Sequence, residues 1–410
     1  MESRTIIIAT ATQFLVMLGF SIVMPIGPDI ALDLGLPVAK LGLLASSYAL
    51  AGFGAGLSAA GLLDRFGRRA PLVAGLTLLG IATLGAGTAD SLPMLMTMRA
   101  IAGGCGGICT ALLTAVIGDT VSAERRGRAY ALVLGTGPLV SIIGLPLAIQ
   151  LAAISSWRAP LLLLGSAALC LMIVTRFTLP PLAGHLEDRV SDDRSLLKEV
   201  PRRPAFRAAM LSVFAMTFAF GLLTANNASL LLLNLHLPRA WLATFYMICG
   251  GTTFLLLRLV GRVADRHGPF TLIRPAVSSF CIGIFFSYVF PPGSIVGVAA
   301  MFITIMSIST LSVSLMTLAL RAPEPTERAG FGALVGALQN LASAAGAGMS
   351  SSILTDLPGP RLGNTHLVGM LAIASAGIVP VLGKQLRREL NLSGRTAPTL
   401  GTQASDQPIV

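Results

Sequence analysis

The stretch "GLLDRFGRR" (residues 61–69) places four charged residues and a glycine between two long segments that carry no charge. The segment "LGLLASSYALAGFGAGLSAA" (41–60) precedes it, and "APLVAGLTLLGIATLGAG" (70–87) follows it. Each flank has about the 20 apolar residues that an α-helix needs to cross a bilayer. The stretch therefore predicts a short polar loop between two membrane helices.

The composition of the whole chain extends this prediction to all 410 residues. Hydrophobic residues make up 54% and charged residues 11%, against about a quarter charged in soluble domains. Alternating segments of about ten residues, typical of a membrane β-barrel, are not seen. We expect an all-α membrane protein with twelve spans, near 5–27, 39–62, 70–89, 92–118, 129–153, 159–179, 206–233, 240–262, 270–291, 294–320, 329–353 and 365–384.

The basic residues predict the orientation of these spans. Of 29 Lys and Arg, 23 fall in loops on one side and 4 on the other. By the positive-inside rule the basic side, with both termini, is cytoplasmic. The net charge of +11 is then a topological signal and predicts no nucleic-acid partner. The first span follows only Glu2 and Arg4 and precedes no cleavage-like site, so we expect a retained helix in a cytoplasmic (inner) membrane.

The opening stretch has a partner later in the chain. Its Asp-Arg-x-Gly core recurs in "GRVADRHGP" (261–269), 201 residues on, and the Glu-Arg-x-Gly at 124–127 recurs at 327–330, 203 residues on. Two offsets this close predict an internal repeat in one orientation. We expect six-helix bundles at 1–180 and 206–388, a cytoplasmic linker at 181–205, and a disordered cytoplasmic tail at 389–410.

These motifs resemble the major facilitator superfamily over nearly the whole chain. The loop at 61–69 is similar to that family's signature between helices 2 and 3, and "MRAIAGGCGG" (98–107) resembles its helix 4 motif. The run 124–160, ending in Trp-Arg-Ala-Pro, is similar to the drug:proton antiporter-like exporters. The resemblance implies two parallel six-helix repeats around a central cavity.

The resemblance also implies gates at the loop motifs. Asp64 and Gly67 would hold the ends of neighbouring helices, while Arg65, Arg68 or Arg69 reaches Asp119 at the end of helix 4. Asp265, Arg266 and Gly268 would form a weaker mirror clamp. The alternative is that these charges only anchor topology and solvate a turn.

Arg99 is a charge expected inside the membrane, where it must face a partner or a wet cavity, or snorkel to the surface. By resemblance it is linked to proton handling. No carboxylate sits in the middle of a predicted span, so Asp29 at the end of helix 1 is the best available proton carrier and the expected neighbour of Arg99. Whether protons are coupled at all stays open.

Several polar residues are candidates for lining the substrate cavity: Gln13, Tyr48, Asn226, Asn227, Ser307, Thr310, Gln339 and Asn340. The adjacent asparagines line the cavity or break helix 7, and the hydroxyls line it or bond to their own backbone. The five cysteines lie in apolar runs and are expected to be buried hydrophobes. No cluster with metal-ligating or catalytic spacing occurs, so we expect no cofactor, no metal and no enzymatic activity.

The sequence thus predicts a transporter that exports a small drug-like, neutral or amphipathic molecule by alternating access. Its expected partners are that substrate, the lipid bilayer and, if it is coupled, protons. The alternatives are a carrier for sugars, nucleosides or amino acids, or a membrane sensor that moves nothing.

Overall fold

A computed structural model describes residues 2–62, 67–179, 200, 202–291, 293–324, 327–359 and 361–392. These residues are almost entirely helical. The N-terminal half contains α1 (Glu2–Ser21), α2 (Val23–Asp33), η1 (Val38–Leu41), α3 (Gly42–Leu62), α4 (Arg69–Gly87), α5 (Leu92–Thr120), α6 (Ala123–Leu134), α7 (Gly137–Leu139), the π-helical η3 (Val140–Gly144), α8 (Leu145–Ile154) and α9 (Arg158–Thr178).

The C-terminal half has a similar succession of long helices and adds a small hairpin, but its fifth span is the single helix α16. It contains α11 (Pro204–Thr224), α12 (Asn227–Ser229), η5 (Leu230–Asn234), α13 (Arg239–His267), α14 (Phe270–Ile284), η6 (Phe285–Val289), α15 (Ser294–Ala319), α16 (Arg328–Ile353), β1 (Thr355–Leu357), β2 (Arg361–Gly363) and α17 (Thr365–Leu392). The segments η5 and η6 are π-helical, and β1 pairs antiparallel with β2.

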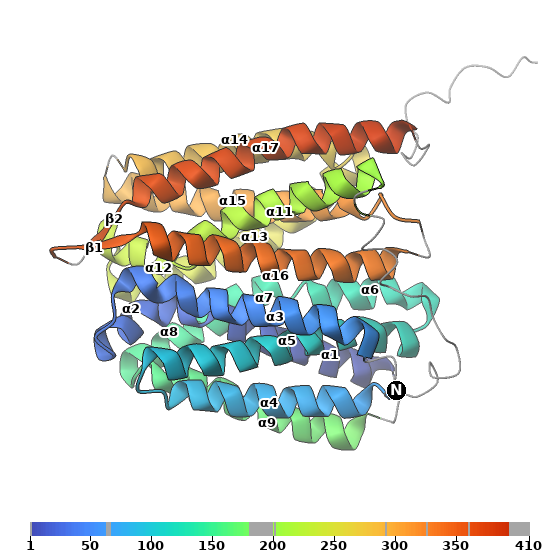
Figure 1. The fold of residues 1–410 in the computed structure, drawn as a ribbon, viewed down its shortest axis with the longest axis horizontal. Helices are drawn as coiled ribbons and strands as arrows, with labels where there is room; N and C mark the ends of the chain where they lie inside the picture. The colour runs from blue at the N-terminus through green and yellow to red at the C-terminus, as the bar shows by residue number, and fades with distance from the viewer. Residues whose placement is uncertain are drawn as a thin grey trace, which may run out of the picture.

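The long helices run side by side along the long axis of the molecule, with the N-terminal half below and the C-terminal half above (Figure 1). The two halves meet where α3 lies against α16. We call the end that carries β1 and β2 the hairpin end. The opposite end, which carries the start of α4 and the end of α17, is the basic end.

The helices confirm the twelve predicted spans. Within the described residues, eleven helices are long and apolar enough to cross a membrane. The twelfth span is α16, which has 26 residues like its neighbour α15 but is rich in Gly, Ala and Ser and contains Gln339 and Asn340. Its polar composition, not its length, sets it apart. Residues 181–199 and 201 of the linker predicted at 181–205 lie outside the described residues, and α11 already begins at Pro204. Of the tail predicted at 389–410, residues 389–392 belong to α17, and the rest lies outside the described residues.

The first helix of each half is interrupted at the same relative place. α1 ends at Ser21 and α2 begins at Val23. Pro25 has no N–H for the carbonyl of residue 21, and its ring crowds that carbonyl, so the helix breaks just before it. In the second half α11 ends at Thr224, and the chain turns at Ala225 and Asn226. Of the two alternatives for the paired asparagines, a break of helix 7 is the one that this turn matches.

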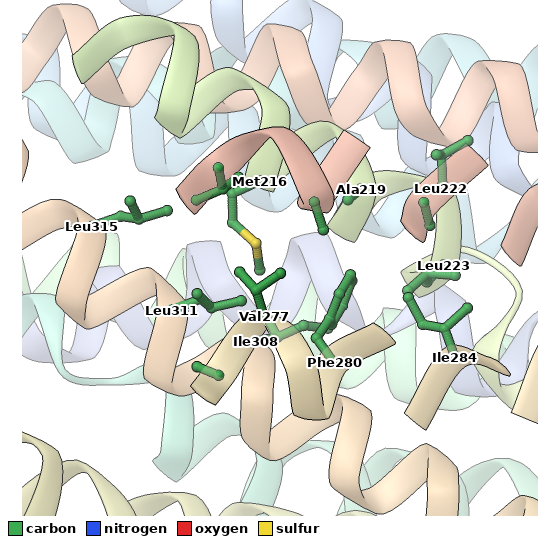
Figure 2. Close-up of a cluster of buried hydrophobic side chains, with 14 of the residues drawn as sticks. Met216, Ala219, Leu222, Leu223, Val277, Phe280, Ile284, Ile308, Leu311 and Leu315 are labelled. Atoms are coloured by element: carbon green, nitrogen blue, oxygen red, sulfur yellow. The ribbon is translucent and has the colours of Figure 1, made fainter. Parts of the chain in front are cut away.

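The apolar cores of the two halves differ. In the C-terminal half the described residues form one continuous cluster in which α11, α14 and α15 contribute Met216, Phe280, Ile308 and their neighbours (Figure 2). The N-terminal half has two main clusters, one towards each end. Leu95 belongs to the cluster at the hairpin end and Ala102 to the other. Arg99 lies between them in the chain.

Candidate functional site

Arg99 of α5 is buried, with 2% of its surface exposed. One of its terminal nitrogens donates to the Gly19 carbonyl, and the other lies 3.2 Å from the Phe20 carbonyl. Both carbonyls belong to the last residues of α1, just before the break. A cation is favourable at a helix C-terminus, where carbonyls lack backbone donors. Arg99 therefore caps α1 from inside the bundle, and among the described residues its Nε has no partner.

Tyr48 of α3 completes this arrangement. Its ring centre lies 4.4 Å from the guanidinium carbon of Arg99, a cation–π contact. Its hydroxyl donates to the Val16 carbonyl at 3.2 Å. A Cβ on Gly106 would lie 2.7 Å from that hydroxyl, and one on Gly103 would clash with the Tyr48 backbone. The helix 4 motif thus combines one cation with glycines that let α5 approach α3.

The expected neighbourhood of Arg99 and Asp29 is not found. Asp29 of α2 instead forms a bidentate ion pair with Arg239, the first residue of α13. The reason lies in the break of helix 1: α2 turns away from the α1 axis and contacts α12 of the other half. The pair joins the two halves at the hairpin end, and bidentate pairs are among the stronger hydrogen-bonded contacts.

A second contact between the halves lies beside this pair. Asp356 of β1 accepts a hydrogen bond of 3.1 Å from the backbone N–H of Ala39, in the first turn of η1. The residue at the N-cap of η1 is Pro37, whose side chain has no oxygen to cap the turn. The C-terminal half therefore caps the start of helix 2 from 317 residues away.

The hairpin that carries Asp356 is itself held by Asn234 of η5. The Asn234 amide nitrogen donates to the Leu362 carbonyl at 2.9 Å, and the Leu362 N–H donates back to the amide oxygen at 3.0 Å. This two-way pairing imitates a neighbouring strand. It fixes β2, and with it β1, on the C-terminal half.

At the basic end the predicted clamp is partly described. Arg68 Nε lies 3.3 Å from Asp119 Oδ2, so Arg68 is a candidate arginine that reaches helix 4. Arg69 turns to the Leu179 carbonyl at 3.1 Å, at the end of α9. Asp64 and Arg65 lie outside the described residues, and their gating role stays a prediction. Gly67 follows them in the loop before α4.

The mirror clamp is not formed in this structure. Asp265 and Arg266 are exposed near the end of α13, and neither makes an ion pair within the described residues. Gly268 has φ = 83°, which favours glycine and ends the helix. In this half an ion pair forms elsewhere: Arg203 at the start of helix 7 lies 2.9 Å from both carboxylate oxygens of Glu327.

The predicted cavity residues are not gathered around one cavity; most pair within their own half. Gln13 accepts from Thr110 at 3.2 Å. Ser307 lies 2.9 Å from the Ser279 hydroxyl, and Thr310 donates to its own helix at 3.0 Å, which is the structural alternative for hydroxyls.

The two asparagines of helix 7 each find a separate partner. Asn226 donates to the Ser350 hydroxyl at 3.2 Å, and the Asn227 amide oxygen lies 2.6 Å from the Tyr288 hydroxyl. Tyr288 also lies 3.1 Å from the Leu223 carbonyl, so it serves the break of helix 7.

The remaining two candidates lie towards the centre of the molecule. Asn340 of α16 lies beside Gly52 of α3, at the contact between the halves. Gln339 lines a small pocket of about 20 Å³ between α11, α15 and α16, with room for little more than a water molecule. The other lining residues are largely apolar: Val213, Met216, Thr217, Ser312, Leu315 and Met316.

Sequence reasoning missed the partners at the hairpin end, Arg239 and Asp356. A usable signal existed for the first of them. Arg239 is among the four basic residues on the side that the positive-inside rule leaves nearly empty. A cation kept there against the general bias needs a local reason, and Asp29 supplies it.

The chain belongs to the Major Facilitator Superfamily, whose family model matches residues 9–347. It is therefore a multi-pass membrane protein with the twelve-helix fold of that family. The D-xylose–proton symporter has the same fold, with a TM-score of 0.73 at 16% identity over 98% of this chain and 99% of that one. A bacterial homologue of the lysosomal transporter Spinster gives 0.69 at 14% identity, over 97% and 99%.

Two curated relatives are named for drug resistance. A chloramphenicol resistance protein of Streptomyces lividans is 29% identical over 250 residues, 58% of this chain and 61% of that protein. Multidrug resistance protein 2 of Bacillus subtilis (strain 168) is 24% identical over 224 residues, 53% and 56%. The chain thus spans little more than half the length of these relatives.

Proposed function

We propose that the chain is a secondary transporter that exports a small neutral or amphipathic organic molecule by alternating access. The observation that carries this proposal is the uneven contact between α3 and α16. Ser46 donates to the Ala344 carbonyl at 2.9 Å, and Gly52 meets Asn340 one to two turns on. One turn further towards the basic end, a Cβ on Gly56 of α3 or Gly336 of α16 would meet no described atom within 4 Å.

Halves that touch at one end and separate towards the other suit one state of a rocking transporter. With the basic end in the cytoplasm, as the positive charges predict, this state is open inwards. Both termini then lie inside. Opening to the outside requires that the Asp29–Arg239 pair and the Asp356–Ala39 bond break. It also requires a clamp at the basic end, for which we propose Arg68 and Asp119, together with Asp64, which lies outside the described residues.

If transport is coupled to protons, Asp29 is the proposed carrier. A protonated carboxyl can no longer accept both donors of Arg239 as an ion, so proton uptake at Asp29 would loosen the hairpin end. Arg99 stays protonated at physiological pH and serves by shaping helix 1. The scheme couples an outside proton to outward opening, and net proton influx further requires that this proton leave Asp29 towards the cytoplasm before the pair with Arg239 forms again.

The substrate class follows from the chemistry of the interior and from the relatives. The small pocket near Gln339 is lined by both apolar and neutral polar side chains and carries no ionised group. Relatives named for resistance to chloramphenicol and to multiple drugs fit the same expectation. A neutral or amphipathic compound needs no fixed countercharge in such a site.

Proteoliposomes with the purified chain test the proposal. We expect uptake of chloramphenicol or a lipophilic dye against a gradient when a pH difference is applied, and little uptake of xylose or uridine. Asp64→Asn, which keeps the positive charges that fix topology, should insert normally and lose most of this flux. Flux of xylose or uridine but not of the drugs would favour the metabolite carrier over the drug exporter. Absence of flux for every compound tested would favour the membrane sensor.

A further inference from the structure

The helices α14 and α17 form an antiparallel pair in the C-terminal half, along the upper side of the molecule in Figure 1. Near the hairpin end Gly369 of α17 packs on Tyr288 and Ile284. Near the basic end Gly383 packs on Ile273 and Phe270. Because rising numbers in one helix meet falling numbers in the other, the seam runs the whole length of both.

Two basic residues stand on the same side of this seam. Arg274 follows Ile273 by one residue, and Lys384 follows Gly383 by one residue. Each step turns a side chain by about 100° around its helix. In antiparallel helices these two rotations lead to the same side, and both side chains are exposed. The two cations therefore stand beside each other along one side of the seam at the basic end.

A third cation, Arg387 of α17, reaches across the seam to α14. The guanidinium carbon of Arg387 lies 5.2 Å from the ring centre of Phe270. Arg274, Lys384 and Arg387 form no ion pair within the described residues. Glu389, the nearest acid in sequence, lies five residues after Lys384 and points about 140° away from it.

An uncharged stripe continues from these cations towards the middle of the bilayer. On α14 it follows Arg274 at helical spacing through Ser278, Cys281 and Phe285. On α17 the same side carries Pro380, Gly377 and Ile373. The rise from residue 274 to residue 285 is about 16 Å. That is close to half of the ~30 Å hydrocarbon core, the depth of one leaflet.

We propose that the seam between α14 and α17 binds an anionic phospholipid. Its phosphate lies between Arg274 and Lys384, and an acyl chain follows the uncharged stripe. Arg387, which stacks on Phe270, borders the same site. Basic pockets between membrane helices are suited to acidic head groups. The site lies on the lipid-facing surface, apart from both gates and from the pocket at Gln339, so it stands or falls independently of the transported compound.

Native mass spectrometry of the full chain in mild detergent tests the site. The protein is titrated with phosphatidylglycerol and, separately, with phosphatidylcholine of the same acyl chains. For Arg274→Gln/Lys384→Gln we expect phosphatidylglycerol to bind about thirtyfold more weakly, because each basic residue near a head group contributes about a factor of five. Phosphatidylcholine binding should not change.

The matched control is Arg176→Gln/Arg262→Gln, which removes the same charge from exposed positions on α9 and α13. It should bind phosphatidylglycerol as the wild type does, and so should the exchange Arg274→Lys/Lys384→Arg. If the double glutamine variant does not purify in folded form, Arg274→Gln and Lys384→Gln are measured separately. Each should bind phosphatidylglycerol about fivefold more weakly than the wild type. Equal affinity in the two glutamine double variants, or displacement of the lipid by millimolar inorganic phosphate, overturns the proposal.

Discussion

The two halves interrupt their first helix 203 residues apart, at Ile22 and Ala225, and satisfy the break differently. In the N-terminal half the exposed carbonyls are met by a buried cation, Arg99. In the C-terminal half the Leu223 carbonyl is met by the neutral hydroxyl of Tyr288. The same backbone requirement thus has two chemical solutions. A buried guanidinium is the more demanding one, because its loss leaves several groups unsatisfied at once.

This difference extends to the cores. At the repeat offset of 201 to 203 residues, Arg99 corresponds to positions 300–302, where Met301 is fully buried. Among the described residues, the C-terminal core therefore contains no buried charge, and its apolar cluster is continuous (Figure 2). The N-terminal core is divided at the level of Arg99.

Making the N-terminal half resemble the other half should have the largest effect. In Arg99→Met two carbonyls in the bundle lose their donors, at about 1–3 kcal/mol each, partly offset by removal of a buried charge. We expect the free energy of unfolding to fall by about 2–3 kcal/mol and transport to fall at least a hundredfold. Thermal unfolding in detergent and proteoliposome flux measure the two quantities.

Arg99→Lys is the informative companion. It keeps the charge, but an ammonium lacks the fork that reaches two carbonyls and the plane that covers Tyr48. Its stability should fall between wild type and Arg99→Met. A methionine variant as stable and active as wild type would show that helix 1 needs no cap.

In the C-terminal half the corresponding change should be milder. Tyr288→Phe removes one hydroxyl from the Leu223 carbonyl and from Asn227, and a neutral hydrogen bond contributes about 1 kcal/mol. We expect unfolding to become easier by about that amount and transport to survive. Tyr246→Phe is the control, since within the described residues the Tyr246 hydroxyl makes no hydrogen bond. If Tyr288→Phe lowers the free energy of unfolding and transport as much as Arg99→Met does, the two halves do not differ in how strongly they depend on these side chains.

Much of this contrast was not visible in the sequence. Span number, the repeat and the break at Asn226 could be predicted, because they depend on local apolar length, motif spacing and residue type. The partners could not: Arg99 meets carbonyls, which every residue carries, and Tyr288 meets helix 7 from 61 to 65 residues away. Polar residues such as Ser307 and Gln13 could be assigned to membrane helices. Residue type alone, however, could not show whether they bond to a partner in their own half or line a cavity.

The ends of the molecule offer a second contrast, which Arg239→Gln is designed to break. Only the hairpin end is joined by a described ion pair between the halves. Because this pair is partly exposed, its loss should shift the conformational equilibrium by up to about 1 kcal/mol, or fivefold. A cysteine at Ser350, buried below the pair, should react correspondingly faster with an impermeant maleimide from that side. The charge swap Asp29→Arg/Arg239→Asp should restore slow labelling. Unchanged labelling in Arg239→Gln would show that the ion pair does not hold the hairpin end closed.

A smaller shift in the same direction is expected for Asp356→Ala. The variant loses a cap that contributes about 0.5–1 kcal/mol, and only the closed hairpin end uses it. Labelling at the same cysteine should rise about threefold. Asp90→Ala is the control, because Asp90 pairs with Arg158 inside the N-terminal half and should leave labelling unchanged. If Asp356→Ala and Asp90→Ala increase the labelling rate equally, the increase reflects the loss of a surface charge and not the loss of the cap.

The smallest expected effect concerns a pair of ion pairs that mirror each other with opposite signs. Glu2 at the start of helix 1 meets Arg125 at 3.4 Å, and Arg203 at the start of helix 7 meets Glu327 at 2.9 Å. Arg125 is 74% exposed, whereas Glu327 is 20% exposed. Exposed pairs contribute from nothing to about 1 kcal/mol, and less screening favours the second. Glu2→Gln should therefore leave the unfolding temperature unchanged, while Arg203→Gln lowers it by a degree or two, and added salt should reduce that difference. If Glu2→Gln is the more damaging variant, the mirror positions differ in something other than exposure, and the reversed signs become the feature to test by exchanging the charges of each pair.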